Sequence, residues 1–315
     1  MALELPKQSY SGQIKTVTLG TGEKAVSVGG ETCYPFYTFE GSVPNLPKIA
    51  MEVYDTQPEG WTPAALEPFA GVTHDPLAWA QKCVADYGAE MLCLQLASTD
   101  PNGANAGAEA AAATVKRVAD AVNVPLIVWG TANHEKDTEV LKRVCEVCQD
   151  KKLIVGPVEE GDYKKIAAVA LGYGHTIAAS SPIDINLAKQ LNILLGNLGV
   201  PDSQIVLDST VSSIGYGIEY CYSVMERTRM AALTQQDTKL QFPIICNLAK
   251  ETWKTKEAKI SSKDDPRMGD AKKRGILLEA MSATMLLMAG ADVIIMRHPD
   301  AIKLVREMIA DLTAK

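Results

Sequence analysis

The sequence lacks the features of membrane, secreted and nucleic-acid-binding proteins. Its 315 residues contain no run of about 18 apolar residues, the length that a bilayer-spanning helix needs. The first residues, MALELPKQSYSGQ, have no apolar signal-peptide core. A net charge of −7 argues against a nucleic-acid partner, because phosphate binding requires a basic surface. We therefore expect a soluble, cytoplasmic protein with neither membrane nor nucleic acid as a partner.

The sequence also lacks a disulfide framework and a clear metal-binding motif. Its seven cysteines have scattered spacings, which indicates reduced thiols. Its four histidines lie in four separate segments, which argues against a catalytic zinc. Cys145 and Cys148 share a face of an expected helix, but a closed metal site needs two further ligands. We interpret this pair as buried apolar side chains.

What the sequence does contain is a repeated alternation of apolar runs and helical patterns. Such strands are typical of a parallel sheet covered by helices. Eight repeats predict an α/β fold, a TIM (β/α)8 barrel over residues 49–315. The alternative, a doubly wound open sheet, usually has a glycine-rich turn after its first strand, and none follows MEVYD. The runs are IAMEVYD (49–55), MLCLQLA (91–97), PLIVWG (125–130), LIVG (153–156), HTIAAS (175–180), QIVLDS (204–209), FPIICNLA (242–249) and DVIIMR (292–297).

Residues 1–48 have a different pattern. TVTLG and KAVSVGG alternate polar and apolar residues on either side of TGE, which predicts a β-hairpin. Val17 and Leu19 would then share an apolar face with Val26 and Val28. We expect residues 1–48 to form this N-terminal hairpin and a lead-in, with the hairpin closing the bottom of the barrel.

The working face of a TIM barrel lies at the carboxyl ends of its strands. Amides and hydroxyls dominate the expected ends, which suits hydrogen bonding to a large polar ligand. No lysine ends a strand, so a Schiff-base aldolase is excluded. The last two strands also lack the glycine-rich loop of sugar-phosphate barrels. The strand-end residues are Asp55, Gln95, Ser98, Trp129, Thr131, Asn133, Gly156, Ser180, Ser181, Asp208, Ser209, Thr210, Asn247, Arg297 and His298.

Several of these positions allow two interpretations. Asn133, like the neighbouring His134, can contact a ligand, but Asn133 can equally cap the next helix. Asp208 can hold a ligand or accept from backbone amides at a helix start. Arg297 can bind an anion or form an internal ion pair with Asp55. These alternatives stay open at the level of the sequence.

Two long segments are expected on the same face. Residues 56–74 contain Trp61 and Phe69, and residues 250–275 are dense in charge and contain Trp253. Loops of this length in a compact domain are usually functional or mobile. Exposed Trp beside charge favours a protein partner or a large cofactor, whereas a solvated excursion is the alternative.

The chain resembles the small subunit of the corrinoid iron–sulfur protein of the acetyl-CoA pathway, the acetyl-CoA decarbonylase/synthase delta-subunit family. The resemblance spans essentially the whole chain and is carried by TVTLGTGEKAVSVGGETCYPF, LPKIAMEVYD, LQLASTDPN and LDSTVSSIGYGIEY. It implies a TIM barrel paired with a large corrinoid iron–sulfur subunit, with cobalamin held between that subunit and the barrel mouth. It also implies a heterodimer that takes a methyl group from a methyltetrahydrofolate:corrinoid methyltransferase and delivers it to acetyl-CoA synthase.

The residues agree with this division of labour. No histidine has the Asp-x-His-x-x-Gly context of a cobalamin module, and CEVC has no companion pair for an iron–sulfur cluster. We therefore expect neither an iron–sulfur cluster nor catalytic residues in this chain. By position, the residues expected to face the corrinoid are Asp208, Ser209, Thr210, Ser212, Ser213, Asn133, Ser180, Asn247 and Arg297.

An enzyme is the alternative function. A pterin-binding, methyltetrahydrofolate-dependent methyltransferase holds its pterin with carboxylates and amides at strand ends. Asp55, Asn133, Asp208 and Asn247 can be assigned to that role. We expect it less than the corrinoid subunit, because the mouth lacks further acids and the Trp-bearing loops suit a protein lid.

Overall fold

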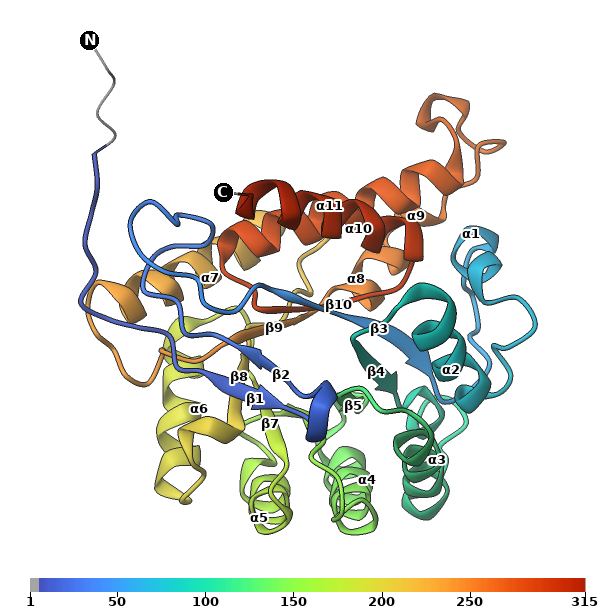
Figure 1. The fold of residues 1–315 in the computed structure, drawn as a ribbon. Coiled ribbons are helices and arrows are strands. Elements are labelled where there is room, and N and C mark those ends of the chain that lie inside the picture. Colours follow the sequence, from blue (N-terminus) through green and yellow to red (C-terminus); the bar gives the residue numbers. More distant parts are fainter. Residues whose placement is uncertain (1–5, 315) are drawn as a thin grey trace.

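Eight parallel strands close into a barrel in the computed structural model, which describes residues 6–314 (Figure 1). The strands follow chain order from β3 to β10, and β10 pairs with β3 in the register Val293 with Lys48. The predicted TIM barrel is therefore confirmed, and each strand lies within two residues of its predicted run. The strands are β3 (Lys48–Tyr54), β4 (Met91–Gln95), β5 (Leu126–Trp129), β6 (Ile154–Val158), β7 (Thr176–Ser180), β8 (Ile205–Asp208), β9 (Ile244–Asn247) and β10 (Val293–Met296).

Helices cover the outside of the barrel, and local capping explains where several of them begin and end. Asp75, Asp184 and Asp270 each accept a backbone N–H at a helix start. Gly88 and Gly290 close two helices in the left-handed conformation that favours glycine. The outer helices are α2 (Pro76–Tyr87), α3 (Ala108–Ala121), α4 (His134–Val147), α5 (Tyr163–Tyr173), α6 (Ile185–Asn197), α7 (Ile218–Leu233), α10 (Ala271–Ala289) and α11 (Pro299–Thr313).

The N-terminal hairpin plugs one end of the barrel, as the sequence predicts. Its strands β1 (Val17–Leu19) and β2 (Val26–Val28) pair antiparallel with Leu19 opposite Val26. Val17 and Leu19 are buried in the same cluster as Ile127 and other inward-facing barrel residues. The start of the lead-in, residues 1–5, lies outside the described residues.

The two long segments on the opposite face are folded, and their aromatic residues do not form an exposed surface. Residues 56–74 contain α1 (Pro63–Leu66), and Phe69 is fully buried against Trp79. Residues 250–275 include most of α8 (Leu248–Lys254) and all of α9 (Lys256–Lys259). Trp253 is buried, and its Nε1 donates to Glu279 Oε2 at 2.9 Å. The expectation of an exposed Trp in the second segment is therefore wrong, whereas residues 261–270, most of them exposed, do form a solvated excursion.

All seven cysteines are free and buried. Cys145 and Cys148 pack into the apolar layer between barrel and helices, which confirms their interpretation as apolar side chains. Burial raises the pKa of the Cys148 thiol to about 11, so this thiol stays protonated at neutral pH. Among residues 6–314, every helix is too short or too polar to span a bilayer.

Candidate functional site

The floor of the barrel mouth is a ring of inward-pointing side chains. Side chains alternate along a strand, so residues two positions apart face the same side. Below the ring lie Ala50, Cys93, Ile127, Ala178, Val206, Ile245 and Ile295, which belong to one buried apolar cluster. Two positions further along each strand stand Glu52, Gln95, Trp129, Ser180, Asp208, Asn247 and Arg297. The change from apolar to polar at this level makes the mouth hydrophilic above a dry core.

One side of the ring is a buried network around Glu52. Arg297 Nε donates to Glu52 Oε2 at 2.7 Å, and Gln95 Nε2 donates to Glu52 Oε1 at 3.0 Å. The same Gln95 amide donates to Asn247 Oδ1 at 3.0 Å. The guanidinium carbon of Arg297 lies 3.4 Å from the centroid of the Trp61 ring. The charge of Arg297 is thus balanced and covered inside the fold.

The internal ion pair proposed for Arg297 exists, but its predicted partner is wrong. Glu52 pairs with Arg297 because both side chains point into the barrel. Asp55 follows the end of β3, and its carboxylate instead accepts from the backbone N of Ser98 at 2.9 Å. Glu52 itself lies within an apolar strand, at the inward register, and that position is the signal that could have identified it.

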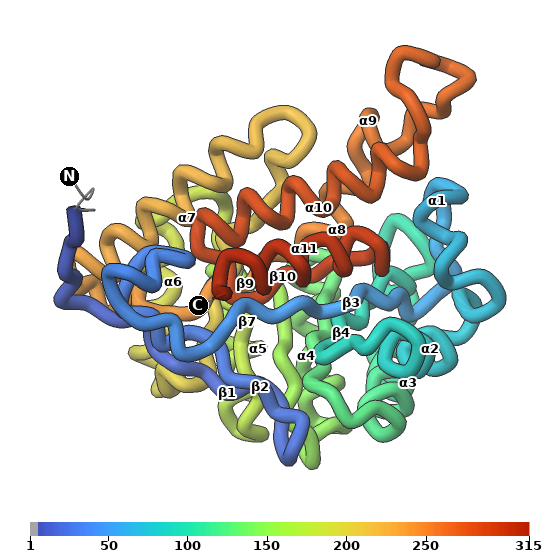
Figure 2. The backbone as a smooth tube through the Cα atoms, turned by 45° about the horizontal axis from the view of Figure 1, so that its top comes forward, coloured from blue at the N-terminus to red at the C-terminus, as the bar shows by residue number. Residues whose placement is uncertain are grey.

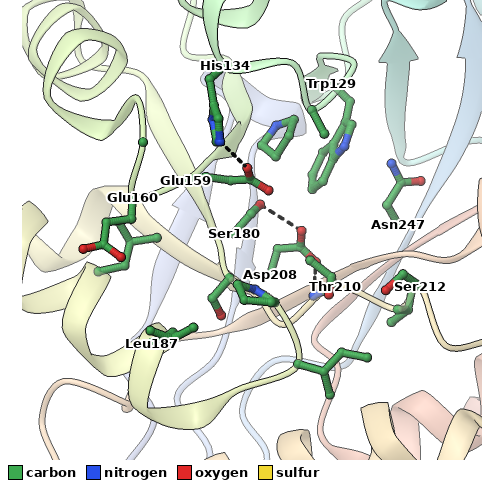
Figure 3. A pocket seen from close by; sticks show the side chains of 18 of the residues that line it. Trp129, His134, Glu159, Glu160, Ser180, Leu187, Asp208, Thr210, Ser212 and Asn247 are labelled. Atoms are coloured by element: carbon green, nitrogen blue, oxygen red, sulfur yellow. Dashed lines mark hydrogen bonds and ion pairs between the residues drawn. The ribbon is translucent and has the colours of Figure 1, made fainter.

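The other side of the ring is centred on Asp208 (Figure 3). Its carboxylate accepts from Ser180 Oγ at 2.8 Å and from the backbone N of Thr210 at 3.0 Å. Burial raises the pKa of Asp208 to about 7, although both hydrogen bonds favour the ionised form. The side chain can therefore lose or gain a proton near neutral pH.

Above Asp208 lies a cavity of about 810 Å³. Two of its lining residues, Ala132 and Thr210, adopt left-handed backbone conformations with φ of 63° and 50°. Such conformations strain a side chain with a β-carbon, and a β-branched Thr most of all. The lining residues are Trp129, Ala132, His134, Pro157, Glu159, Glu160, Gly161, Ser180, Ser181, Pro182, Ile183, Leu187, Leu191, Asp208, Thr210, Val211, Ser212, Asn247, Lys250 and Glu251.

The cavity is richer in acids than the strand ends predict. Glu159 and Glu160 follow β6, and Glu251 lies in α8, so all three enter from loops and helices. Beside Asp208 they outnumber the single lysine of the wall, Lys250. The expectation that the mouth lacks further acids is therefore wrong, because it considered only the strand ends.

His134 pairs with Glu159 at the cavity wall (Figure 3) and with the buried Asp162 behind it. Its Nδ1 lies 3.2 Å from Asp162 Oδ2, and its Nε2 lies 3.5 Å from Glu159 Oε2. The hydrogen bond to Asp162 raises the pKa of His134 above its usual value. Burial raises the pKa of the Glu159 carboxyl. This pairing holds the Glu159 side chain at the cavity wall.

The structure brings five of the nine predicted ligand residues to the cavity: Ser180, Asp208, Thr210, Ser212 and Asn247. The other four are outside its lining. Asn133 caps α4 by accepting from the backbone N of Lys136 at 3.0 Å, so its capping interpretation is confirmed. Ser209 is buried, the hydroxyl of Ser213 lies 2.7 Å from Cys221 Sγ, and Arg297 pairs with Glu52.

The described fold is shared with solved dihydropteroate synthases. That of Xanthomonas albilineans in complex with 4-aminobenzoic acid has a TM-score of 0.58 at 12% identity, over 86% of this chain and 94% of that chain. That of Thermus thermophilus in complex with 4-aminobenzoate has a TM-score of 0.57 at 14% identity, over 95% of this chain and 99% of that chain. Identities this low show the fold alone.

Similarity in sequence is more specific. The acetyl-CoA decarbonylase/synthase complex subunit delta of Archaeoglobus fulgidus is 35% identical over 98% of this chain and 70% of its own length. The subunit of the same name from Methanothermobacter thermautotrophicus is 34% identical over 96% of this chain and 77% of its own. The family described as CO dehydrogenase/acetyl-CoA synthase delta subunit matches residues 16–312. The chain belongs to this family, as its resemblance predicts.

Proposed function

We propose that this chain is the small subunit of a heterodimeric corrinoid methyl carrier. In this function its barrel mouth covers a cobalamin held by a large corrinoid iron–sulfur subunit. The carrier takes a methyl group from a methyltetrahydrofolate:corrinoid methyltransferase and delivers it to acetyl-CoA synthase. Relatives named as subunits of an acetyl-CoA decarbonylase/synthase complex support this proposal.

The chemistry of the cavity is the observation that carries the proposal. The rim of a corrinoid is rich in amide side chains, whose N–H groups need acceptors. Carboxylates of Asp208, Glu159 and Glu251 supply acceptors around the cavity, and Thr210 and Ser212 add hydroxyls. The Ser181 hydroxyl is buried in the lining without a hydrogen-bond partner. A buried orphan of this kind costs free energy unless a ligand or water satisfies it, so the lining fits an amide-bearing ligand.

The residues of this chain would bind and shield rather than react. When bound, the cobalt of the corrinoid supplies the methyl-transfer chemistry. Asp208, fixed by Ser180, and Glu159, fixed by His134, would accept from rim amides at two sides of the cavity. Trp129 and Leu187 supply apolar wall that excludes water.

Filling the cavity tests the proposal. The exposed Ser212 lines the cavity after the end of β8, whereas the exposed Ser203 lies at the opposite end of that strand. In the pair of subunits, Ser212→Trp should reduce the retained corrinoid at least about fivefold, because the indole occupies the space of the macrocycle rim. Cobalt analysis and the visible spectrum after gel filtration measure the retention. Ser203→Trp is the matched control, and equal retention in both variants would contradict the proposal.

A pterin-binding, methyltetrahydrofolate-dependent methyltransferase is the second candidate. It is favoured by one observation, the presence of the Asp208 carboxyl and the Asn247 amide in the same cavity. The two functions differ in what the chain binds alone. Calorimetric titration of the isolated chain with methyltetrahydrofolate should give no heat of binding if the mouth serves a corrinoid. Saturable binding that Asp208→Asn abolishes would instead establish the enzyme.

A further inference from the structure

Helix α10 is apolar on its outer face as well as on its inner face. Its inner side packs against the barrel through residues such as Ala283 and Leu286. After Lys273, every exposed position of the helix is Leu or Met. These four residues, which we name the α10 stripe, are Leu277, Met281, Met285 and Met288. A helix that is apolar all round is normally buried, so the outer face of α10 lacks its cover.

The α10 stripe has the geometry of a helix-packing surface. Leu277, Met281 and Met285 are spaced four residues apart, which aligns them as one ridge along the helix. Met281 is 64% exposed, the most exposed of the four. Met side chains are flexible and fill irregular gaps, which suits a surface that another helix covers.

The neighbouring helix α7 adds one exposed Met to this flank. Figure 2 shows α7, α10 and α11 side by side on one flank of the barrel. Arg229 of α7 donates to the backbone O of Gly290 at the end of α10, and the next residue, Met230, is 44% exposed. The other exposed positions in the second half of α7 are polar, among them Glu226 and Arg227, so the apolar face of this flank is that of α10.

A basic protrusion adjoins the stripe at the mouth end of the barrel. Residues 254–274, which we name the α9–α10 hairpin, project beyond the barrel in both views (Figures 1 and 2). The hairpin carries eight Lys and Arg residues against four carboxylates, in a chain whose net charge is −7. Within residues 6–314, the hairpin cations without a carboxylate at ion-pair distance are Lys256, Lys259, Lys263, Lys273 and Arg274.

The apolar and basic features meet in one groove. Leu277, Leu278 and Met281 form its apolar part, and Lys273 and Arg274 stand at the hairpin end. Arg274 donates to the backbone carbonyls of Glu257, Ile260 and Met268 and so holds the hairpin together. The exposed Lys273 makes no ion pair among residues 6–314, so its ammonium group is the one that an outside carboxylate can reach. Asp270 also lines the hairpin end, where two cations stand against this one carboxylate. A ligand that is apolar at one end and acidic at the other therefore matches the groove.

We propose that the α10 stripe and the α9–α10 hairpin bind a helix of another subunit of the complex, with apolar residues every three or four positions and carboxylates facing the hairpin. This inference rests on the proposed function, which supplies a large subunit that covers the mouth. The hairpin stands at the rim of that mouth and the stripe leads down the flank, so one partner can cover both. Charge complementarity favours an acidic partner over a second copy, whose own hairpin is basic.

Binding of the large corrinoid iron–sulfur subunit to stripe variants tests this inference. The double variant Met281→Glu/Met285→Glu should raise the Kd of the pair about 100-fold or more, because it places two charges at the centre of an apolar contact. The control is Ile193→Glu, an equally apolar and 38% exposed residue on α6. It should change the Kd less than about threefold. Both variants should keep the melting temperature of the wild-type chain, since all three side chains are exposed.

Charge reversal on the hairpin tests the acidic end of the partner. Lys256→Glu/Lys263→Glu should raise the Kd about tenfold at low salt and flatten its dependence on ionic strength. A Kd that neither the stripe variant nor the hairpin variant alters overturns the inference. A chain that dimerises alone through the stripe, while its pairing with the large subunit is insensitive to the stripe, also overturns it.

Corrinoid retention separates this inference from the proposed function. If stripe substitutions weaken the pairing of the two subunits but the wild-type pair holds no corrinoid, the docking surface is supported and only the proposed function is contradicted. A pair that holds corrinoid and ignores the stripe contradicts the docking surface alone. Wild-type subunits that fail to pair at all overturn both.

Discussion

The Asp208 carboxyl group is buried at the barrel mouth with one hydroxyl and one backbone amide as partners. Among residues 6–314 no Lys, Arg or His forms an ion pair with it, and Arg297, across the ring, is already paired with Glu52. Desolvation therefore dominates, and the pKa of Asp208 rises to about 7. A residue that changes charge near neutral pH at the floor of the cavity can adapt to either a donor or an acceptor on a ligand.

The raised pKa of Asp208 predicts a pH dependence of stability. The folded-state pKa lies above the unfolded value, so the stabilising contribution is full below the unfolded pKa of about 3.9 and is lost as pH rises through about 7. Asp208→Asn removes this dependence. Relative to wild type, the variant should gain about 3 kcal/mol of unfolding free energy between pH 5 and pH 8. Urea unfolding at both pH values measures it, and Asp311→Asn on the exposed face of α11 is the control. Parallel behaviour of Asp208→Asn and wild type would refute the assignment.

Sequence reasoning located single residues well where strand alternation governs them. It placed Ser180, Asp208 and Asn247 at the mouth, and all three line the cavity. It failed to identify the ion-pair partner of Arg297, because that partner is contributed by another strand. Arg297 pairs with Glu52, whose side chain points into the barrel, whereas the Asp55 carboxylate accepts from Ser98. The sequence alone places both acids in the same strand run and does not decide between them.

At the scale of elements, regular patterns were predictable and the packing of long connections was not. The eight short apolar runs and the alternating pattern of the hairpin are both typical of strands, so the sequence predicts them directly. The segments 56–74 and 250–275 have no such period, and their order comes from tertiary partners. Trp253 is buried because Glu279, on a different helix, accepts its indole N–H. Glu251 reaches the cavity from such a connection, and Glu159 from the short one after β6, so neither lies at a predicted strand end.

The hairpin plug should contribute measurably to the stability of the barrel. Leu19 is buried in the barrel interior, whereas the neighbouring Thr18 points to solvent and lies 3.3 Å from Ser27 across the hairpin. Leu19→Ala should lower the unfolding free energy by about 2–5 kcal/mol, because it leaves a cavity in a closed core. Thr18→Ala should cost less than about 1 kcal/mol. Urea denaturation compares the two, and equal losses would mean that the hairpin does not act as a plug.

At the scale of the whole molecule, the fold and the function are separate conclusions. The chain shares its barrel with dihydropteroate synthases, whose identities of 12% and 14% carry no information on ligands. Membership in the delta-subunit family makes the chain a subunit of an acetyl-CoA decarbonylase/synthase complex. The lining of the cavity supports the proposal that this subunit contacts a corrinoid. Two surfaces then remain for a partner, the acidic mouth and the α10 stripe on the flank. Because the α9–α10 hairpin stands at the mouth end of the barrel, the two proposals together require that a single large subunit reach both surfaces.

If the barrel mouth covers only one side of a corrinoid, as proposed, the chain alone should not retain the corrinoid. The isolated chain, incubated with cobalamin and passed through gel filtration, should emerge colourless with less than about 0.1 cobalt per chain. In the proposed function its cavity would contact only one side of the corrinoid rim, and the free energy gained from that side alone would be offset by the entropy lost on fixing the ligand. The chain produced together with the large subunit should retain about one cobalt per pair, because each subunit then contacts one side. Cobalt analysis and visible absorption measure both samples. A stoichiometric corrinoid in the isolated chain would show that this barrel is the carrier itself, and the large subunit would then have to act elsewhere in the transfer.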